Sequence, residues 1–242
     1  MARTVEAPGG AALLRLVRPK QWVKNVLVFA APGAAGVLDE GSALTDTLLA
    51  FVCFCLAAAG TYCLNDVRDV EADRRHPTKR HRPVASGAVP APLATVLGIV
   101  LVVGAVVLAL AVRWPLAATV GGYVVLTTSY SVVLKHVAVV DVVAVAAGFV
   151  LRAIGGATAT DVPISDWFFI VTSFGSLFMV SGKRGAEAAE VGGDVAIRKS
   201  LAAYTPGYVA YLRSVSSSAV LVAYCLWAFE KAGESGADVP WY

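Results

Sequence analysis

The sequence predicts an all-α integral membrane protein, a bundle of transmembrane helices. Of its 242 residues, 57% are hydrophobic and only 15% are charged, and the mean hydropathy is +0.70. Soluble domains are about 45–50% apolar and about 25% charged. The composition therefore excludes a disordered chain, a coiled coil and most soluble enzymes. The apolar residues also run on without alternating with polar ones, which excludes the strands of a membrane β-barrel.

Seven apolar stretches are candidate membrane spans, because a helix needs about 20 mostly apolar residues to cross a bilayer. Only two of them, 44–64 and 137–159, contain a charged residue, whereas the first is short and contains Pro32. A cleaved signal peptide is the alternative interpretation of that first stretch. We expect a single transmembrane domain over residues 1–242, with spans at 25–38, 44–64, 91–112, 114–134, 137–159, 167–182 and 214–229.

The distribution of basic residues predicts the orientation of the bundle. Cytoplasmic loops of membrane proteins carry an excess of Lys and Arg. With the N-terminus in the cytoplasm, 17 of the 20 Lys and Arg residues fall on the cytoplasmic side, and the opposite loops are mainly acidic. We therefore expect a multi-pass protein of the inner (plasma) membrane whose charged loops face the cytoplasm. Nothing in the composition indicates nucleic acid binding, and a homo-oligomer remains open.

The segment 65–87 concentrates charge in a chain that otherwise avoids it. Asp66, Asp69 and Asp73 are spaced i, i+3 and i+7, which places them on one helical face if the second span continues. Three such carboxylates repel one another unless a cation lies among them, and Mg²⁺ prefers carboxylate oxygens, waters and substrate phosphates. The spacing predicts a magnesium site made by Asn65 and the three aspartates, which we take as the catalytic residues. The alternative is a solvated loop that only maintains topology.

Basic and aromatic residues at the predicted cytoplasmic ends are candidates for phosphate binding, because guanidinium and ammonium groups suit phosphate oxygens. Each of these residues could instead only set the orientation of the protein in the membrane. Arg152 lies inside a predicted span, where an arginine is costly and indicates either function or a structural pairing. The substrate-binding candidates are Lys20, Lys24, Asn65, Lys79, Arg82, Tyr130, Lys135, Lys183, Arg184 and Glu187.

The order of residues in the charged segment resembles a known family. Asn65-Asp66-x-x-Asp69-x-x-x-Asp73, followed by His76-Pro77-x-Lys79-Arg80-x-Arg82-Pro83-x-x-Ser86-Gly87, is similar to the first motif of the UbiA superfamily of intramembrane prenyltransferases. The resemblance implies a helical bundle, usually of nine spans, with a cytosol-facing cavity in which Mg²⁺ holds a diphosphate. It assigns the metal to Asn65, Asp66, Asp69 and Asp73, and phosphate contacts to Lys79 and Arg82. Seven spans against nine imply that C-terminal spans are missing here.

One departure from the usual family pattern narrows the expected chemistry. Prenyl-diphosphate users carry a second aspartate-rich motif after the sixth span, but residues 181–187 read SGKRGAE. Together with RPKQWVKN at 18–25, YSVVLK at 130–135 and GFVLRAIGGATA at 148–159, this resembles an actinobacterial branch of the family. That branch is a Mg²⁺-dependent glycosyltransferase. It moves 5-phosphoribose from phosphoribosyl diphosphate (PRPP) to polyprenyl (decaprenyl) phosphate, releasing diphosphate, for cell-wall arabinan precursors.

Two alternative functions remain open at this point. The first is a prenyltransferase that moves a prenyl chain from its diphosphate to an aromatic acceptor. The second is a membrane transporter with a charged vestibule. The basic residues at 183 and 184 argue against the first, and the absence of a convincing inverted repeat argues against the second.

Overall fold

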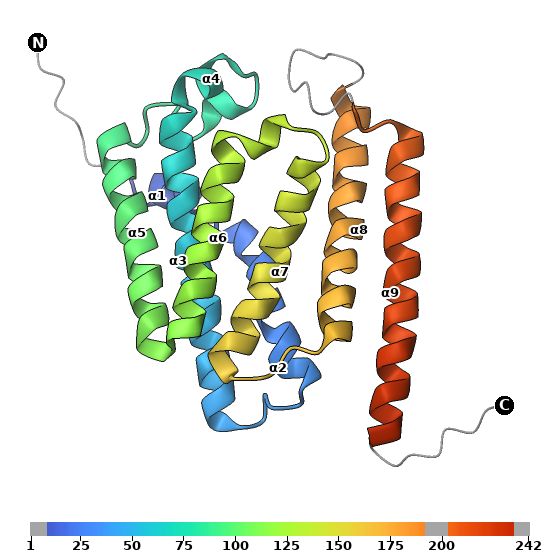
Figure 1. Cartoon of the computed structure of the whole chain (residues 1–242). Coiled ribbons are helices and arrows are strands. Elements are labelled where there is room, and N and C mark those ends of the chain that lie inside the picture. Colours follow the sequence, from blue (N-terminus) through green and yellow to red (C-terminus); the bar gives the residue numbers. More distant parts are fainter. Residues whose placement is uncertain (1–8, 192–202, 235–242) are drawn as a thin grey trace, which may run out of the picture.

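The computed structural model describes residues 9–191 and 203–234, and in these ranges all of the regular elements are helices (Figure 1), which confirms the all-α prediction. They are α1 (Gly10–Val17), η1 (Pro19–Phe29), α2 (Ala30–Ala34), α3 (Gly41–Arg68), α4 (Val70–Arg75), η2 (Lys79–His81), α5 (Ala91–Val112), α6 (Trp114–Val132), η3 (Leu134–His136), α7 (Val140–Thr160), α8 (Asp166–Val191) and α9 (Pro206–Glu234).

Four of these helices are long and apolar enough to cross a membrane. They are α3, α5, α7 and the part of α9 from Pro206 to Glu230. The helices α6 and α8 lie beside them in the same bundle (Figure 1), so six of the predicted spans coincide with long helices. The transmembrane helical bundle is confirmed, whereas the number of seven spans stays a prediction.

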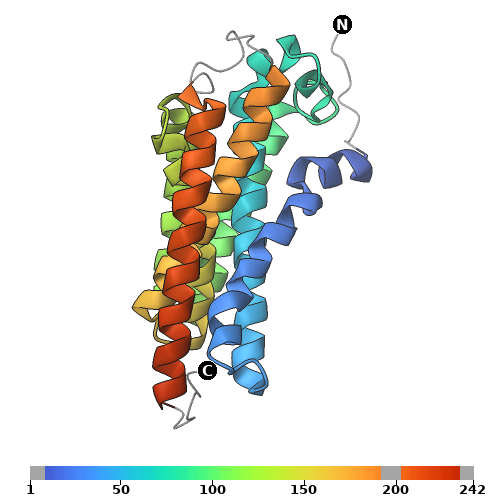
Figure 2. The same ribbon diagram turned by 90° about the vertical axis from the view of Figure 1, so that its right-hand side faces the viewer.

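The first predicted span, residues 25–38, is not one α-helix. The chain forms the 3₁₀ helix η1 as far as Phe29 and then the short helix α2, which a turn at Gly36 follows. Pro32 lies within α2 and has no N–H for a helical hydrogen bond. This segment runs obliquely along the bundle from α1 toward the far end of α3 (Figure 2). An apolar stretch interrupted by proline therefore adopts a tighter, broken path instead of a regular span.

Small residues allow the helices around α3 to approach closely. A Cβ added to Gly60 of α3 would lie 2.7 Å from the carbonyl oxygen of Gly98 on α5. A Cβ added to Gly156 of α7 would lie only 1.7 Å from the carbonyl oxygen of Val28 on η1. Close backbone approach at glycine is the usual way in which membrane helices pack. These contacts fix η1 against α7 and α5 against α3.

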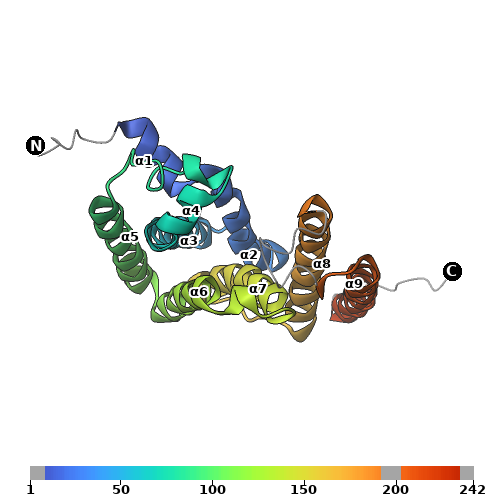
Figure 3. The ribbon, with the colours of Figure 1, turned by 90° about the horizontal axis from the view of Figure 1, so that it is seen from above.

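Seen from above, α6, α7 and α8 curve around the segment made by η1 and α2 (Figure 3). The α3–α6 side of this curve is closed by an aromatic pair, Phe54 and Tyr123, whose ring centroids are 5.4 Å apart. The polar side chains of η1, α3, α6, α7 and α8 consequently face a shared interior space.

Candidate functional site

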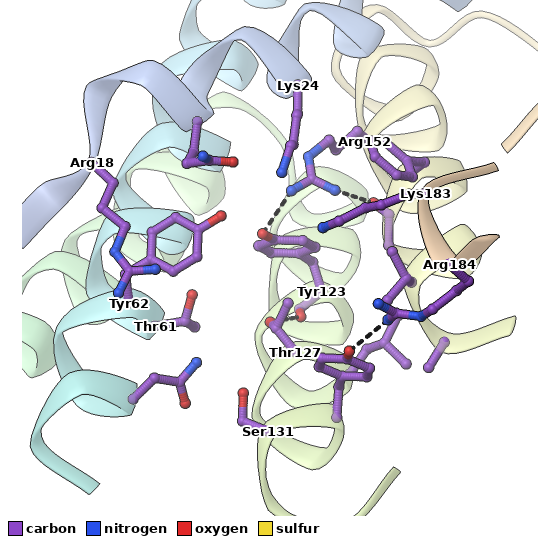
Figure 4. A pocket seen from close by; sticks show the side chains of 18 of the residues that line it. Arg18, Lys24, Thr61, Tyr62, Tyr123, Thr127, Ser131, Arg152, Lys183 and Arg184 are labelled. Carbon is purple, nitrogen blue, oxygen red and sulfur yellow. Dashed lines mark hydrogen bonds between the residues drawn. The ribbon is translucent and has the colours of Figure 1, made fainter. Parts of the chain in front are cut away.

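A cavity of about 380 Å³ lies between η1, α3, α6, α7 and α8 (Figure 4). Its described lining contains five Lys and Arg residues but one carboxylate, so the space favours an anion. Its size is within the range of small-molecule sites, about 300–1,000 Å³. The lining residues are Arg18, Gln21, Lys24, Thr61, Tyr62, Asn65, Tyr123, Leu126, Thr127, Tyr130, Ser131, Ala144, Val145, Gly148, Phe149, Arg152, Lys183, Arg184 and Glu187.

The 3₁₀ winding of η1 places a row of polar side chains on the cavity wall. Residues three apart in a 3₁₀ helix lie above one another. Gln21 and Lys24 of η1 have this spacing and line the cavity, and Arg18, the residue immediately before η1, lines it as well. Hydropathy and a 3.6-residue period would not predict this row.

Arg152 is held inside the cavity by neutral groups. Its side chain on α7 is 6% exposed. The guanidinium donates hydrogen bonds to Asn25 Oδ1 at 2.7 Å, to the Tyr123 hydroxyl at 2.8 Å and to the Gly148 carbonyl at 2.6 Å. The sequence indicated Arg152 as an intramembrane charge but did not indicate Asn25 or Tyr123 as its partners.

Arg184 contributes to the cavity wall through a network of polar contacts. Its Nε atom is 3.0 Å from Asp141 Oδ2, and its Nη2 atom donates to the Tyr130 hydroxyl at 2.9 Å. Nη1 is paired with Glu187. The side chain therefore joins α6, α7 and α8, and most of its donors are engaged. The sequence predicted Arg184, Tyr130 and Glu187 as substrate-binding residues, and the structure brings these three together.

Tyr204 extends this network to the segment before α9. Its hydroxyl donates to Asp141 and accepts the N–H of Val139 at 3.0 Å. Val139 has φ 69° and ψ −52°, a positive-φ conformation that is unusual for a β-branched residue. Burial raises the pKa of the Tyr204 phenol, and its hydrogen bond to Asp141 raises it further. The phenol therefore remains a protonated donor at neutral pH.

The three predicted catalytic aspartates lie beside the cavity, and each has a basic partner. The buried Asp66 accepts from Arg18 at 2.5 Å and from Arg82 at 3.4 Å. Asp73 accepts from Arg82 at 2.7 Å, and Lys135 is 3.5 Å from Asp69. Basic side chains thus provide the compensation that the sequence argument assigned to a metal ion alone.

The aspartates do not share one continuous helix, contrary to the expectation from their spacing. The helix α3 ends at Arg68, and Asp69 has φ −90° and ψ 9° between α3 and α4. Hydrogen bonds from Asp69 N–H to Asn65 O and from Asp73 N–H to Asp69 O still bridge the break. The change of direction turns Asp69 toward Lys135, while Asp66 and Asp73 converge on Arg82.

The donor set fits a hard cation that shares its coordination with a substrate. Within residues 9–191 and 203–234, no three His, Cys, Asp or Glu side chains are grouped for metal binding. However, the buried Oδ2 atom of Asp66 has no hydrogen-bond partner in the described structure. Mg²⁺ commonly uses one or two carboxylates and completes its shell with water and phosphate oxygens. A carboxylate oxygen without a partner, on the residue next to the cavity-lining Asn65, suits this mode.

Of the remaining predicted substrate-binding residues, some line the cavity and others do not. Lys24, Asn65 and Lys183 line the cavity, and Lys183 is 3.6 Å from Glu187. Lys20 on η1 and Lys79 on η2 are exposed and do not line it. The cavity also includes residues that the sequence did not indicate as ligand-binding, among them Arg18, Gln21, Thr61, Tyr62, Tyr123, Thr127 and Ser131.

The fold and the site together define a helical membrane protein with a cation-lined interior cavity next to an aspartate-rich helix end. Residues 26–233 match the profile of the UbiA prenyltransferase family, and the chain belongs to this family.

Proteins with high sequence similarity share one name. The chain is 48% identical over 233 residues to the decaprenyl-phosphate phosphoribosyltransferase of Mycobacterium tuberculosis, covering 94% of this chain and 77% of that protein. The protein of the same name from Mycolicibacterium smegmatis is 45% identical over 244 residues, covering 96% and 76%. The one from Corynebacterium glutamicum is 43% identical over 236 residues, covering 95% and 71%.

Solved structures of low sequence identity share the fold. A UbiA homolog from Archaeoglobus fulgidus bound to GPP and Mg²⁺ has a TM-score of 0.69 at 19% identity, covering 90% of this chain and 77% of that one. A structure of digeranylgeranylglyceryl phosphate synthase has a TM-score of 0.71 at 16% identity, covering 91% and 78%. These likenesses confirm the predicted UbiA-like architecture.

Proposed function

We propose that this protein transfers 5-phosphoribose from PRPP to a polyprenyl phosphate, such as decaprenyl phosphate, and releases diphosphate. The observation that carries the proposal is the cavity lining, in which five cations stand against one carboxylate. A donor with two phosphorylated ends and a phosphorylated lipid acceptor require such an excess of positive charge. The names of relatives 43–48% identical to the chain support the same reaction.

The transfer replaces one bond at the anomeric carbon of the donor. An oxygen of the lipid phosphate attacks C1 of the ribose, the bond from C1 to the diphosphate oxygen breaks, and the diphosphate leaves with the electron pair. The acceptor phosphate is mostly ionised at neutral pH, because the second pKa of a phosphate monoester is about 6. It needs no general base, so catalysis would depend on positioning and on compensating the charge of the leaving group.

Residues at the aspartate-rich edge would handle the leaving diphosphate. Asn65, Asp66, Asp69 and Asp73 are the candidate ligands of Mg²⁺, which when bound would offset the negative charge that develops on the diphosphate. Arg18 and Arg82 already contact Asp66 and can donate to phosphate oxygens from the same position. The cell-wall role and a cavity that faces the cytoplasm across the inner membrane belong to this proposal.

Product formation by the purified chain tests the proposed reaction. The protein, reconstituted in lipid nanodiscs with Mg²⁺, would receive PRPP labelled in the ribose together with decaprenyl phosphate. We expect label in the lipid fraction and one diphosphate released for each labelled lipid. A parallel reaction would contain a prenyl diphosphate and an aromatic acid.

Two results would contradict the proposal. A prenylated aromatic product without a phosphoribosyl lipid would instead support the aromatic prenyltransferase. Movement of an anion into liposomes without turnover of PRPP would support a transporter.

A further inference from the structure

Arg152, a buried cation of the cavity wall, has no carboxylate partner among the described residues. Its three hydrogen-bond acceptors are an amide oxygen, a hydroxyl and a carbonyl, and its guanidinium also lies over the Tyr123 ring at 4.6 Å. These contacts use three of the five N–H donors of the guanidinium and leave its charge uncompensated. A buried charge without an opposite charge is costly, especially within a membrane. An anion in the cavity would offset this cost.

Two further cations approach the same part of the cavity from other segments. Lys24 of η1 is close enough to Arg152 and Lys183 for both to repel its ammonium group. Figure 4 shows Lys24, Arg152 and Lys183 near the Tyr123 hydroxyl, with Arg18 and Tyr62 across the cavity. Glu187 is 3.6 Å from Lys183, but it is also paired with Arg184. Mutual repulsion opposes this arrangement in the absence of a ligand.

This cluster is different in kind from the aspartate-rich edge. At that edge, Arg18 and Arg82 are each paired with a carboxylate, and a bound diphosphate would share the edge with a metal ion. Around Arg152, the described groups provide positive charge and neutral donors. A site with several cations and few acids suits a phosphate monoester dianion bound directly, without a metal.

We propose that Lys24, Arg152 and Lys183 form a second phosphate subsite, which takes a phosphate monoester and is separate from the diphosphate position beside Asp66. The inference rests on the proposed transfer between two phosphorylated substrates and deepens it. Either the 5-phosphate of the donor or the phosphate of the lipid acceptor has the required chemistry. Hydrogen bonds to Asn25 and Tyr123 hold the Arg152 guanidinium in place, whereas the ammonium groups of Lys24 and Lys183 reach the subsite on long side chains.

Binding of the separate phosphate monoesters tests the subsite in the full chain without Mg²⁺. The probes are ribose 5-phosphate, for the donor end, and farnesyl phosphate, for the lipid head group, measured by calorimetry in nanodiscs. Lys24→Met removes a charge without removing a hydrogen bond to the protein. Loss of a charged hydrogen bond to a ligand costs enough to weaken binding at least about tenfold. We expect this loss for one monoester in Lys24→Met and again in Lys183→Met.

Matched variants separate the subsite from a general effect of charge or folding. Arg15→Met removes an exposed cation of α1 and should leave both monoester affinities within about twofold. Arg152→Lys keeps the charge and should retain more affinity than Arg152→Gln. Thermal unfolding identifies a variant that fails to fold. If Arg152→Gln does so, the two lysine variants still decide the question.

The outcomes assign the ligand or overturn the proposal. A selective loss of ribose 5-phosphate affinity places the donor's 5-phosphate in the subsite, and a selective loss of farnesyl phosphate affinity places the lipid phosphate there. If the wild-type chain binds neither monoester, or if both lysine variants bind them unchanged, the subsite is refuted. Monoester binding without formation of a phosphoribosyl lipid would instead refute the proposed reaction and leave the subsite standing.

Discussion

At the residue scale, Asp66 connects parts of the chain that are far apart in sequence. Its buried carboxylate, 1% exposed, contacts Arg18 from the N-terminal segment and Arg82 from the loop before α5. One oxygen receives both contacts, while Oδ2 has no hydrogen-bond partner in the described structure. The side chain therefore orders two cations and also offers a ligand atom.

Replacing Asp66 by Asn should lower the rate of phosphoribosyl transfer at least about a hundredfold, the usual effect of losing a group that stabilises developing charge. The change removes a candidate metal ligand and leaves Arg18 and Arg82 less compensated. Labelled lipid formation measures the rate, and thermal unfolding checks that the chain is folded. Glu71→Gln is the control, because the pair of Glu71 and Arg74 is exposed on both sides and contributes little. An unchanged rate in Asp66→Asn would remove that residue from the site.

Replacing Tyr204 by Phe should lower the free energy of unfolding by about 1–3 kcal/mol, because Asp141 loses a donor and the Val139 N–H loses its acceptor. A raised pKa means that the contribution of the phenol is complete below the ordinary tyrosine value of about 10 and declines only as pH rises through the higher value in the folded protein. Unfolding midpoints at pH 7 and 9 should therefore show the same difference between wild type and variant. A difference that vanished at pH 9 would contradict this assignment.

At the scale of elements, the contact between η1 and α7 determines the geometry of the cavity. Gly156 lets the backbone of α7 reach the Val28 carbonyl, and one turn away along α7 Arg152 meets Asn25 of η1. Packing and the polar contact therefore depend on the same approach of two elements.

Gly156→Ala should disrupt this approach, because the added Cβ would lie 1.7 Å from a backbone oxygen that cannot move aside like a flexible side chain. Overpacking costs typically about 1–3 kcal/mol, and here η1 must also shift away from Arg152. We expect a lower melting temperature together with a loss of transfer activity. Gly122→Ala is the matched control, because no atom lies within 4 Å of its added Cβ. Equal melting temperatures for the two variants would show that the contact is not tight.

Some elements could be predicted from sequence and others could not, for physical reasons. Uninterrupted apolar runs predicted α5 with the bounds that the structure has, because burial in lipid requires apolar side chains over the whole length. The first segment could not be predicted in this way, since hydropathy does not distinguish a 3₁₀ helix from an α-helix, and η1 packs against α3 and α7, which are distant in sequence. The aspartate motif indicated which residues gather, but the contact of Asp69 with Lys135 joins positions 66 residues apart, which the spacing of the motif does not reveal.

At the scale of the whole molecule, the charged loops lie at one end of the bundle. The segment from α4 through η2 and the turn at η3 are at the same end, which is the upper end in Figure 1. The paired aspartates are also at this end, since α3 finishes there. Water-soluble substrates should consequently enter from one side of the membrane only.

Vesicles of known orientation test this sidedness. We expect PRPP to be consumed when it is supplied on the side that bears the basic loops. Vesicles with the opposite orientation should consume PRPP at about the same rate once they have been permeabilised. Intact vesicles with the opposite orientation should be inactive, because PRPP does not cross a lipid bilayer. Equal activity in both intact preparations would contradict a one-sided cavity.

Removing divalent cations tests the proposed metal at the level of the assembled protein. We expect EDTA to abolish transfer and Mg²⁺ to restore it, while Ca²⁺, which prefers longer bonds and more ligands, should restore less. The melting temperature should change little, because basic partners already neutralise the three aspartates. Transfer that persists in EDTA would exclude a metal requirement.

The 3₁₀ winding of η1 also sets the direction of the Lys24 side chain, and with it the positive charge inside the cavity. Gln21 and Lys24 of η1 are three residues apart, which is one full turn of a 3₁₀ helix, so their side chains share a direction, and both line the cavity. At 3.6 residues per turn the second side chain would be rotated by about 60° from the first. Rewinding this stretch as an α-helix would therefore turn the Lys24 ammonium group relative to the cavity and would also displace Asn25 from Arg152. The electrostatic potential of the cavity therefore depends on the pitch of this helix.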